Sequence, residues 1–130
     1  MDMGKKGRVF KYTRFSRFAS KEGITDHELL EAVDQLEDDQ ADANLGGDVY
    51  KVRIARPGEG KRGGHRVIVY FRNEFRTFFS YGFSKNDRGN ISRRELKGFK
   101  EAAKMLFSFT EDEIEAYLRN RILIEIIEED

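Results

Sequence analysis

Residues 49–83 read VYKVRIARPGEGKRGGHRVIVYFRNEFRTFFSYGF, and this stretch decides the fold. Apolar and basic or small side chains alternate over residues 50–55, as in a strand with one buried face. Residues 66–72 and 75–83 are apolar on both faces, which is typical of strands inside a sheet. The Asn-Glu pair at 73–74 separates these two runs and predicts a tight hairpin turn. The middle of the chain is therefore expected to form an antiparallel meander.

Helices are predicted on both sides of this meander in the sequence. Residues 25–28, 92–95 and 110–113 each place Thr or Ser three positions before Glu, which is the spacing of a capping box at a helix N-terminus. Residues 8–13 alternate as a short strand does, and the β-branched segment 121–127 is a candidate edge strand. We predict an α+β fold, in which a small twisted antiparallel sheet is packed with N-terminal and C-terminal helices.

The composition fits one small domain without metal or disulfide chemistry. A chain of 130 residues is expected to fold as a single domain over 1–130, with a core at about 8–107 and an acidic C-terminal extension at 108–130. It has no cysteine, which excludes disulfides, thiolate zinc sites and a cysteine nucleophile. His27 and His65 are far apart in sequence, so no metal site is predicted. No apolar stretch suits a signal peptide or a membrane span, and we expect a cytoplasmic protein.

The charges are segregated along the chain, although the formal net charge is zero. Residues 21–48 carry ten acidic and one basic side chain, whereas residues 49–76 carry eight basic and two acidic ones. Residues 111–130 return to eight acidic and two basic. Such a pattern can form a basic face that binds phosphates, or simply a solvated surface with many salt bridges. The charge pattern alone does not distinguish these two interpretations.

Basic residues gather around the glycine-rich hairpin that joins the first two strands of the meander. Lys51 and Arg53 share a strand face, and Arg66 begins the next strand just beyond the hairpin, so these three side chains are candidates to converge. The glycines do not have the spacing of a P-loop, and a strand rather than a helix follows them. Lys85 and Asn86 follow the last strand of the meander, where side chains often contact ligands. The alternative is a flexible hairpin with solubilising charges.

Two segments resemble a known family of toxins. Residues 45–72, LGGDVYKVRIARPGEGKRGGHRVIVYFR, and residues 78–92, FFSYGFSKNDRGNIS, are similar to RelE-like toxins of type II toxin–antitoxin systems, in particular the HigB-type branch. The similarity covers roughly residues 8–107. It implies an endoribonuclease, or mRNA interferase, which enters the ribosomal A site and cuts mRNA. It also implies a helix-turn-helix antitoxin as partner and a reaction that needs no metal or other cofactor.

The resemblance also implies roles for individual residues. In that family the 2′-hydroxyl of a ribose attacks the adjacent phosphate, so the site needs a base, an acid and positive charge near the phosphate. Lys51 and Arg53 match basic strand residues that line the family's active site, Arg66 matches an arginine expected to clamp the transition state, and Lys85 matches a candidate proton donor. The expected RNA contacts are Arg56, Lys61, Arg62, Tyr81 and Asn86.

His65 departs from the family motif, in which a tyrosine or a small residue is more common. An ordinary histidine pKa of about 6.5 suits acid–base chemistry, so His65 is included among the candidate catalytic residues. The alternatives are positioning or stacking on a base. The general base of the reaction is not identified by the motif.

Two other functions are compatible with the same fold. ParE-type toxins share it and inhibit DNA gyrase without being enzymes, and an inactive module that only binds its antitoxin is a third reading. The basic hairpin and Lys85 favour RNA, because a gyrase inhibitor has no need for converging phosphate ligands.

Overall fold

The computed structural model describes residues 7–56, 60–84 and 90–128. In sequence, a strand, two helices and a short strand precede the meander, and two helices and a strand follow it. The elements are β1 (Arg8–Tyr12), α1 (Thr13–Glu22), α2 (Asp26–Glu37), β2 (Ala43–Gly46), β3 (Val49–Arg56), β4 (Gly60–Arg72), β5 (Arg76–Ser84), α3 (Arg93–Ser108), α4 (Glu111–Arg119) and β6 (Leu123–Ile126).

The strands form one sheet in the order β2-β3-β4-β5-β1-β6. The meander β3-β4-β5 is antiparallel, as predicted, and β4 lies inside the sheet with a partner on each side. β1 pairs with β5 in parallel and with β6 in antiparallel orientation. The α+β class is therefore confirmed, with one parallel pair in an otherwise antiparallel sheet.

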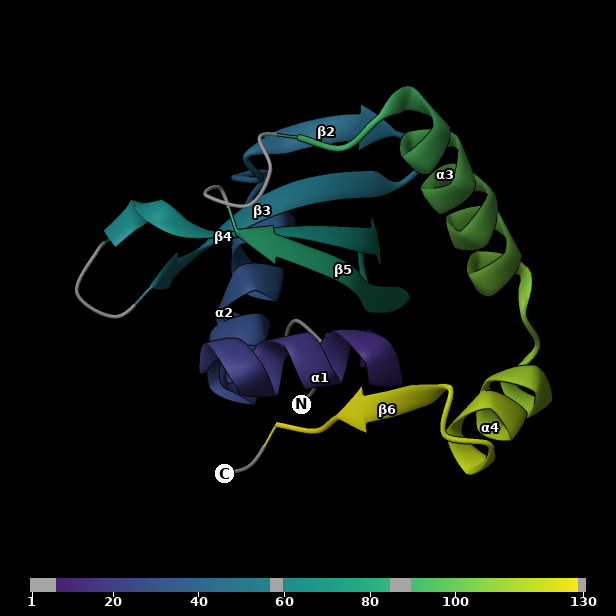
Figure 1. Ribbon diagram of the computed structural model, residues 1–130. Helices are drawn as coiled ribbons and strands as arrows, with labels where there is room; N and C mark the ends of the chain where they lie inside the picture. Colours follow the sequence, from purple (N-terminus) through teal and green to yellow (C-terminus); the bar gives the residue numbers. More distant parts are fainter. Residues whose placement is uncertain (1–6, 57–59, 85–89, 129–130) are drawn as a thin grey trace.

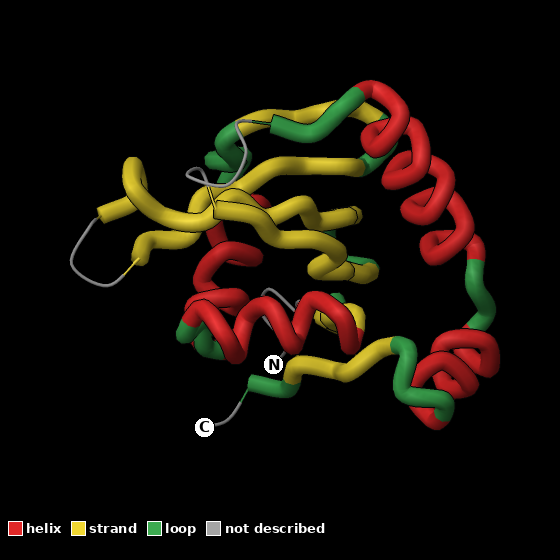
Figure 2. Tube along the Cα trace, viewed as in Figure 1, coloured by secondary structure: helices red, strands yellow, loops and turns green. Residues whose placement is uncertain are grey.

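Each face of the sheet is covered by one pair of helices. Val9, Val67 and Phe79 of the sheet pack in one apolar cluster with the buried side chains of α1 and α2. The opposite face contributes Ile68 and Phe78, which pack in a second cluster with residues of α3 and α4. Figure 1 shows α1 and α2 packed together, away from α3 and α4, and Figure 2 shows the strands between the two pairs. In the part of the chain that is described, every helix is too short or too polar to cross a membrane.

All three predicted capping boxes are present. The hydroxyl of Thr25 accepts a hydrogen bond from the backbone of Glu28, whose carboxylate accepts one from the Thr25 backbone. Ser92 and Thr110 have the same reciprocal bonds at the starts of α3 and α4. Each box satisfies amide groups that the helix itself leaves unpaired, so these sequence signals fix where α2, α3 and α4 begin.

Two elements were not predicted. The strand expected at 8–13 ends at Tyr12, and α1 follows without a break. Tyr12 caps α1 without a side-chain hydrogen bond, so the usual N-terminal signal is missing. β2 is short and pairs only with the first residues of β3.

The candidate edge strand at 121–127 is confirmed as β6, and the segment expected as an acidic extension contributes α4 and β6 to the fold.

Ion pairs connect β1 and β5 to the C-terminal elements. Arg8 lies between Glu111, Glu115 and Glu125, at 3.3, 3.0 and 2.8 Å. The hydrogen bond from Arg8 to Glu125 raises the pKa of the Arg8 guanidinium further above its usual range. Arg76 donates to Glu111 at 2.6 Å, and this bond lowers the pKa of the Glu111 carboxyl. Glu111 and Glu115 of α4 and Glu125 of β6 therefore have defined partners on the sheet.

The lowered pKa of Glu111 predicts a dependence of stability on pH. A carboxyl whose pKa is lower in the folded state stabilises the fold fully above its unfolded pKa of 4.5, and loses that contribution as the pH falls through the folded value. Glu111→Gln should therefore be less stable than the wild type at neutral pH and should lose less stability on acidification. Because the side chain is 65% exposed, the effect will be small and weaker at high salt. Urea unfolding at pH 6 and below pH 4.5 measures it; equal acid-induced losses for the two proteins would contradict it.

Candidate active site

The register of β3 and β4 brings the basic residues of the meander onto one face. Arg53 lies directly opposite Arg66, and Lys51 lies opposite Ile68. Ile68 belongs to the apolar cluster under α3 and α4, so all four residues face away from α1 and α2. Lys51 and Arg53 share a strand face as predicted, and the register adds Arg66 to the same face of the sheet.

Arg66 is the most deeply buried basic residue of this group. Its exposed fraction is 6%, and its Nη1 donates a hydrogen bond of 3.2 Å to the carbonyl oxygen of Gly64. No ion pair joins it to a carboxylate within residues 7–56, 60–84 and 90–128. A buried charge is costly unless it is paired, so a positive group of this kind is a candidate contact for an anionic ligand.

Lys51 and Arg53 are held near Arg66 by an acidic residue at the edge of the sheet. Asp42 lies 2.9 Å from the Nε of Arg53 and 3.8 Å from the Nζ of Lys51. β2 pairs with β3 only as far as Lys51, so Arg53 sits where the edge of β3 is open. Asp42 therefore orients both cations and offsets part of their charge.

His65 lies on the other face of the sheet from Arg66. It is 1% exposed, its ring meets Phe18 of α1 edge-on, and its Nε2 is 2.8 Å from a carboxylate oxygen of Glu22. Its Nδ1 has no hydrogen-bond partner among the described residues. The structure therefore separates His65 from the basic face, because neighbouring residues of a strand point to opposite sides.

A largely buried aromatic cluster continues the basic face along β5. Tyr81 lies opposite Ile68 in the sheet and is partly buried. Its ring lies 5.9 Å from that of Phe83 and 5.9 Å from that of Phe99 on α3. Aromatic rings on a basic surface are suited to stacking with nucleobases, and the same rings also hold α3 against the sheet.

The sequence model of a protein family, described as the RelE toxin of the RelE / RelB toxin–antitoxin system, matches residues 7–126 of this chain. The chain belongs to the RelE toxin family. It is therefore a toxin of a toxin–antitoxin system, and its partner is an antitoxin. The match includes the basic face, the hairpin and the C-terminal elements α4 and β6. Within the described parts of this RelE toxin no group of three or more His, Cys, Asp or Glu residues is arranged to hold a metal ion.

Some of the predicted site residues of the toxin are not placed. Lys85 and Asn86 lie outside the described residues, and so do the side chains of Arg56, Lys61 and Arg62. The backbone of the last three belongs to β3 and β4, in the hairpin that Figure 1 shows extending beyond the helices. Ser84, the last residue of β5, lies opposite His65, so the chain leaves β5 beside the residue that precedes Arg66.

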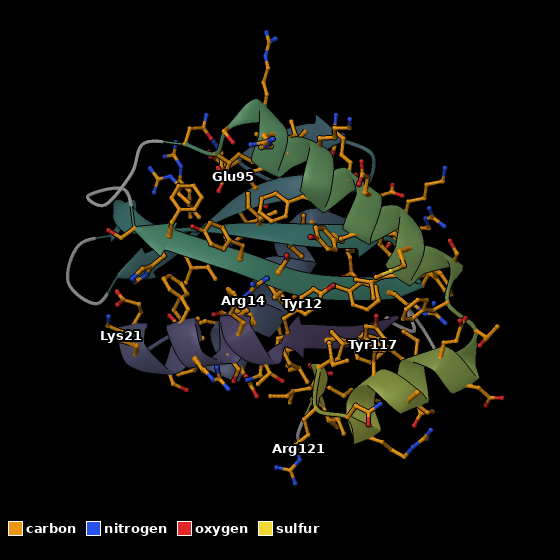
Figure 3. The ribbon with its side chains drawn as sticks, turned by 45° about the vertical axis from the view of Figure 1, so that its right-hand side comes forward. Tyr12, Arg14, Lys21, Glu95, Tyr117 and Arg121 are labelled. Carbon is orange, nitrogen blue, oxygen red and sulfur yellow. The ribbon has the colours of Figure 1, made fainter. Side chains whose placement is uncertain are left out.

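The structure also brings Tyr12, Arg14 and Tyr70 of the toxin close enough to influence one another, which the sequence did not indicate. Burial raises the pKa of Tyr12, and that of Tyr70 to about 12, while the charge of Arg14 acts in the opposite direction on both. The hydroxyl of Tyr70 is 2.8 Å from Ser80 Oγ on β5. Figure 3 shows Tyr12 and Arg14 side by side between α1 and the sheet. Arg14 follows the end of β1 closely, and this position past a strand end is the signal that could have identified it.

Proposed function

We propose that this toxin is an endoribonuclease of the HigB type, which cuts mRNA on the ribosome in the cytoplasm without a catalytic metal ion. The observation that carries the proposal is the buried guanidinium of Arg66, which has no carboxylate partner among the described residues and lies opposite Arg53. A non-enzymatic inhibitor has no use for a desolvated cation of this kind, whereas a phosphate that gains charge in a transition state is stabilised by it.

The reaction needs no group beyond the side chains of the chain and the RNA itself. The 2′-oxygen of a ribose attacks the adjacent phosphorus and loses its proton to a base, while the bond from phosphorus to the 5′-oxygen breaks. The leaving oxygen takes up a proton, and the products are a 2′,3′-cyclic phosphate and a free 5′-hydroxyl. We assign the charge stabilisation to Arg66, Lys51 and Arg53, and the proton for the leaving oxygen to Lys85.

The hairpin and the end of β5 are assigned to RNA binding. Lysine and arginine side chains on a projecting hairpin can neutralise phosphates of the RNA strand, and an aromatic ring beside them can stack with a base. The residues proposed for these contacts are Arg56, Lys61, Arg62, Tyr81 and Asn86.

We infer that His65 positions the start of β4 instead of transferring a proton. Its ring is enclosed between the sheet and α1, and its hydrogen bond to Glu22 ties the C-terminal turn of α1 to the residue next to Arg66. His65→Phe should keep the cleavage pH profile of the wild type and should lose about 1 kcal/mol of stability with the hydrogen bond. Cleavage rates from pH 5 to 9 and thermal unfolding measure the two effects. If a folded variant loses one limb of the pH profile, His65 takes part in the chemistry.

A cleavage assay tests the proposed function. The purified toxin is incubated with mRNA, with and without ribosomes, in the presence of EDTA, and the ends of the products are analysed. We expect cleavage that depends on ribosomes and leaves 2′,3′-cyclic phosphates. Products with 5′-phosphates would contradict the mechanism. Intact RNA together with inhibition of gyrase supercoiling would instead support a ParE-type inhibitor.

A further inference from the structure

We propose that one flank of α3 binds the phosphate backbone of double-helical RNA, separately from the face that carries Arg66. The flank consists of Arg93, Lys97, Lys100 and Lys104, and we call it the α3 basic flank. The proposal rests on the proposed function in that it takes RNA as the target. It adds a second contact surface, which holds a folded RNA such as a ribosomal helix while the other face contacts the strand that is cut.

The spacing of the four residues places them in one narrow row. At 3.6 residues per turn, positions 93, 97, 100 and 104 fall within an arc of about 60°. With a rise of 1.5 Å per residue they extend over about 16 Å of the helix axis, at intervals of about 4.5 to 6 Å. The apolar residues Phe99, Ala103 and Leu106 lie in the cluster between α3 and the sheet. The row is therefore a regular array of charges beside the buried stripe of the helix.

Among the described residues these four cations have no ion pair, in contrast to several basic residues of the strands. Arg8, Lys11, Lys51, Arg53 and Arg76 each form an ion pair. Across residues 7–56, 60–84 and 90–128, no ion pair involves the α3 basic flank, although Glu101 lies beside it.

The arrangement is unfavourable for the helix by itself. Like charges three or four residues apart repel one another. Arg93 in the first turn also opposes the helix dipole, which favours negative charge there. A negatively charged ligand bound beside the row would relieve the repulsion between these side chains. It would also screen Arg93 from the helix dipole, so binding would stabilise the helix.

The surface beside the row contains two hollows, and the side chain of Lys100 is held in place by the β2–β3 turn. One hollow of about 370 Å³ is lined by the four basic residues with Leu96 and Glu101. A second, of about 500 Å³, lies toward the β2–β3 turn, and Lys100 and Lys104 line both. The stem of Lys100 rests on this turn, since a Cβ on Gly47 would lie 3.1 Å from its Cγ. Figure 1 shows α3 beside the ends of β2 and β3. Two lysines are thus placed at hollows that phosphates can enter.

A regular row of three lysines and one arginine along a helix fits the repeating phosphates of an RNA duplex better than an acidic protein. Double-stranded RNA is recognised mainly through its shape and its backbone phosphates, which repeat regularly along the helix. Lysine contributes a flexible point charge to such a contact and does not read sequence. We therefore expect binding that is strong at low salt and largely independent of sequence.

Binding to an RNA that cannot be cut tests the proposal independently of cleavage. The probe is a 2′-O-methyl RNA hairpin, in which the attacking hydroxyl is blocked, and fluorescence anisotropy gives its affinity at several salt concentrations. Lys100→Gln/Lys104→Gln should bind about tenfold more weakly at low salt, and the slope of log K against log salt should become shallower by about 2. The matched control is Arg119→Gln/Arg121→Gln, which removes two exposed charges at the end of α4 and should leave affinity and slope nearly unchanged.

The outcomes separate this proposal from the proposed function. Equal losses in both double variants, or no loss in either, would overturn the α3 basic flank as a binding surface. Poly-glutamate that competes as well as an RNA duplex at the same charge concentration would also overturn it, in favour of an acidic protein. If the wild type binds the hairpin as expected but cuts no RNA, the surface stands and the nuclease proposal fails. If the wild type cuts mRNA but does not bind the hairpin, the nuclease proposal stands and the α3 basic flank fails as a binding surface.

Discussion

Arg66→Ala should lower the rate of mRNA cleavage by about 10²-fold or more, which is the usual scale for removing one electrostatic contact to a transition state. Arg66 is 6% exposed and its guanidinium is fixed by its bond to Gly64, so its charge acts in a poorly hydrated position. Arg66→Lys should recover only part of the rate, because a point charge does not replace a planar group that binds two oxygens. Cleavage of a defined mRNA on ribosomes measures both variants.

Arg66→Ala should remain folded and should still bind the antitoxin. Removal of a buried cation without a carboxylate partner does not leave an uncompensated opposite charge, in contrast to the breaking of an ion pair. Arg119→Ala, which removes an exposed arginine from the last turn of α4, is the matched control and should cut at the wild-type rate. Full toxicity of Arg66→Ala in cells at normal protein levels would show that the active site lies elsewhere.

Arg76→Ala should be strongly destabilising. The Arg76 side chain is 4% exposed, and its Nη1 donates to the carbonyl oxygens of Leu106 at 3.0 Å and Phe109 at 2.8 Å. These bonds satisfy the C-terminal end of α3, and the bond to Glu111 joins it to α4. Loss of the guanidinium leaves buried carbonyls without a donor, at about 1–3 kcal/mol for each group. We expect a total loss of about 3 kcal/mol, a large part of the stability of about 5–15 kcal/mol of an ordinary domain.

Arg72→Ala is the matched control for this prediction. Arg72 lies directly opposite Arg76 at the same hairpin, but its side chain is 51% exposed and pairs with the partly exposed Asp48. An exposed pair of this kind contributes less than about 1 kcal/mol. Urea unfolding of both variants should therefore show a clear difference in midpoint. Similar midpoints would mean that burial of Arg76 does not determine its contribution.

The sequence predicts those parts of the fold that carry local signals. The capping boxes specify α2, α3 and α4, and the alternation of residues 50–55 specifies β3. α1 has no capping side chain, and its apolar residues Phe15 and Ala19 follow directly on a strand, so its start has no local mark. The parallel pairing of β1 with β5 joins residues far apart in sequence, and no pattern within either strand specifies a partner.

The candidate site was predictable to the extent that strand periodicity determines which side chains share a face. It places Lys51 with Arg53, and their closeness to Arg66 follows from the hairpin. The same rule separates His65 from Arg66, since adjacent residues point to opposite faces, although the family motif treats them as neighbours. Asp42 reaches Lys51 and Arg53 from the segment between α2 and β2, and only the packed structure shows this.

The position of β1 between β5 and β6 determines when the sheet of this toxin can be completed during translation. β1 is the first strand made, yet one of its edges pairs with β5 and the other with β6, whose residues 123–126 are made much later. Until β6 emerges, Arg8 has no Glu125 to bind and the outer edge of β1 is open. The nascent chain can form the β3-β4-β5 meander early. At that stage it still lacks α4 and the edge strand β6, which pairs with β1. A ribosome that makes this toxin therefore carries an incomplete sheet for most of translation.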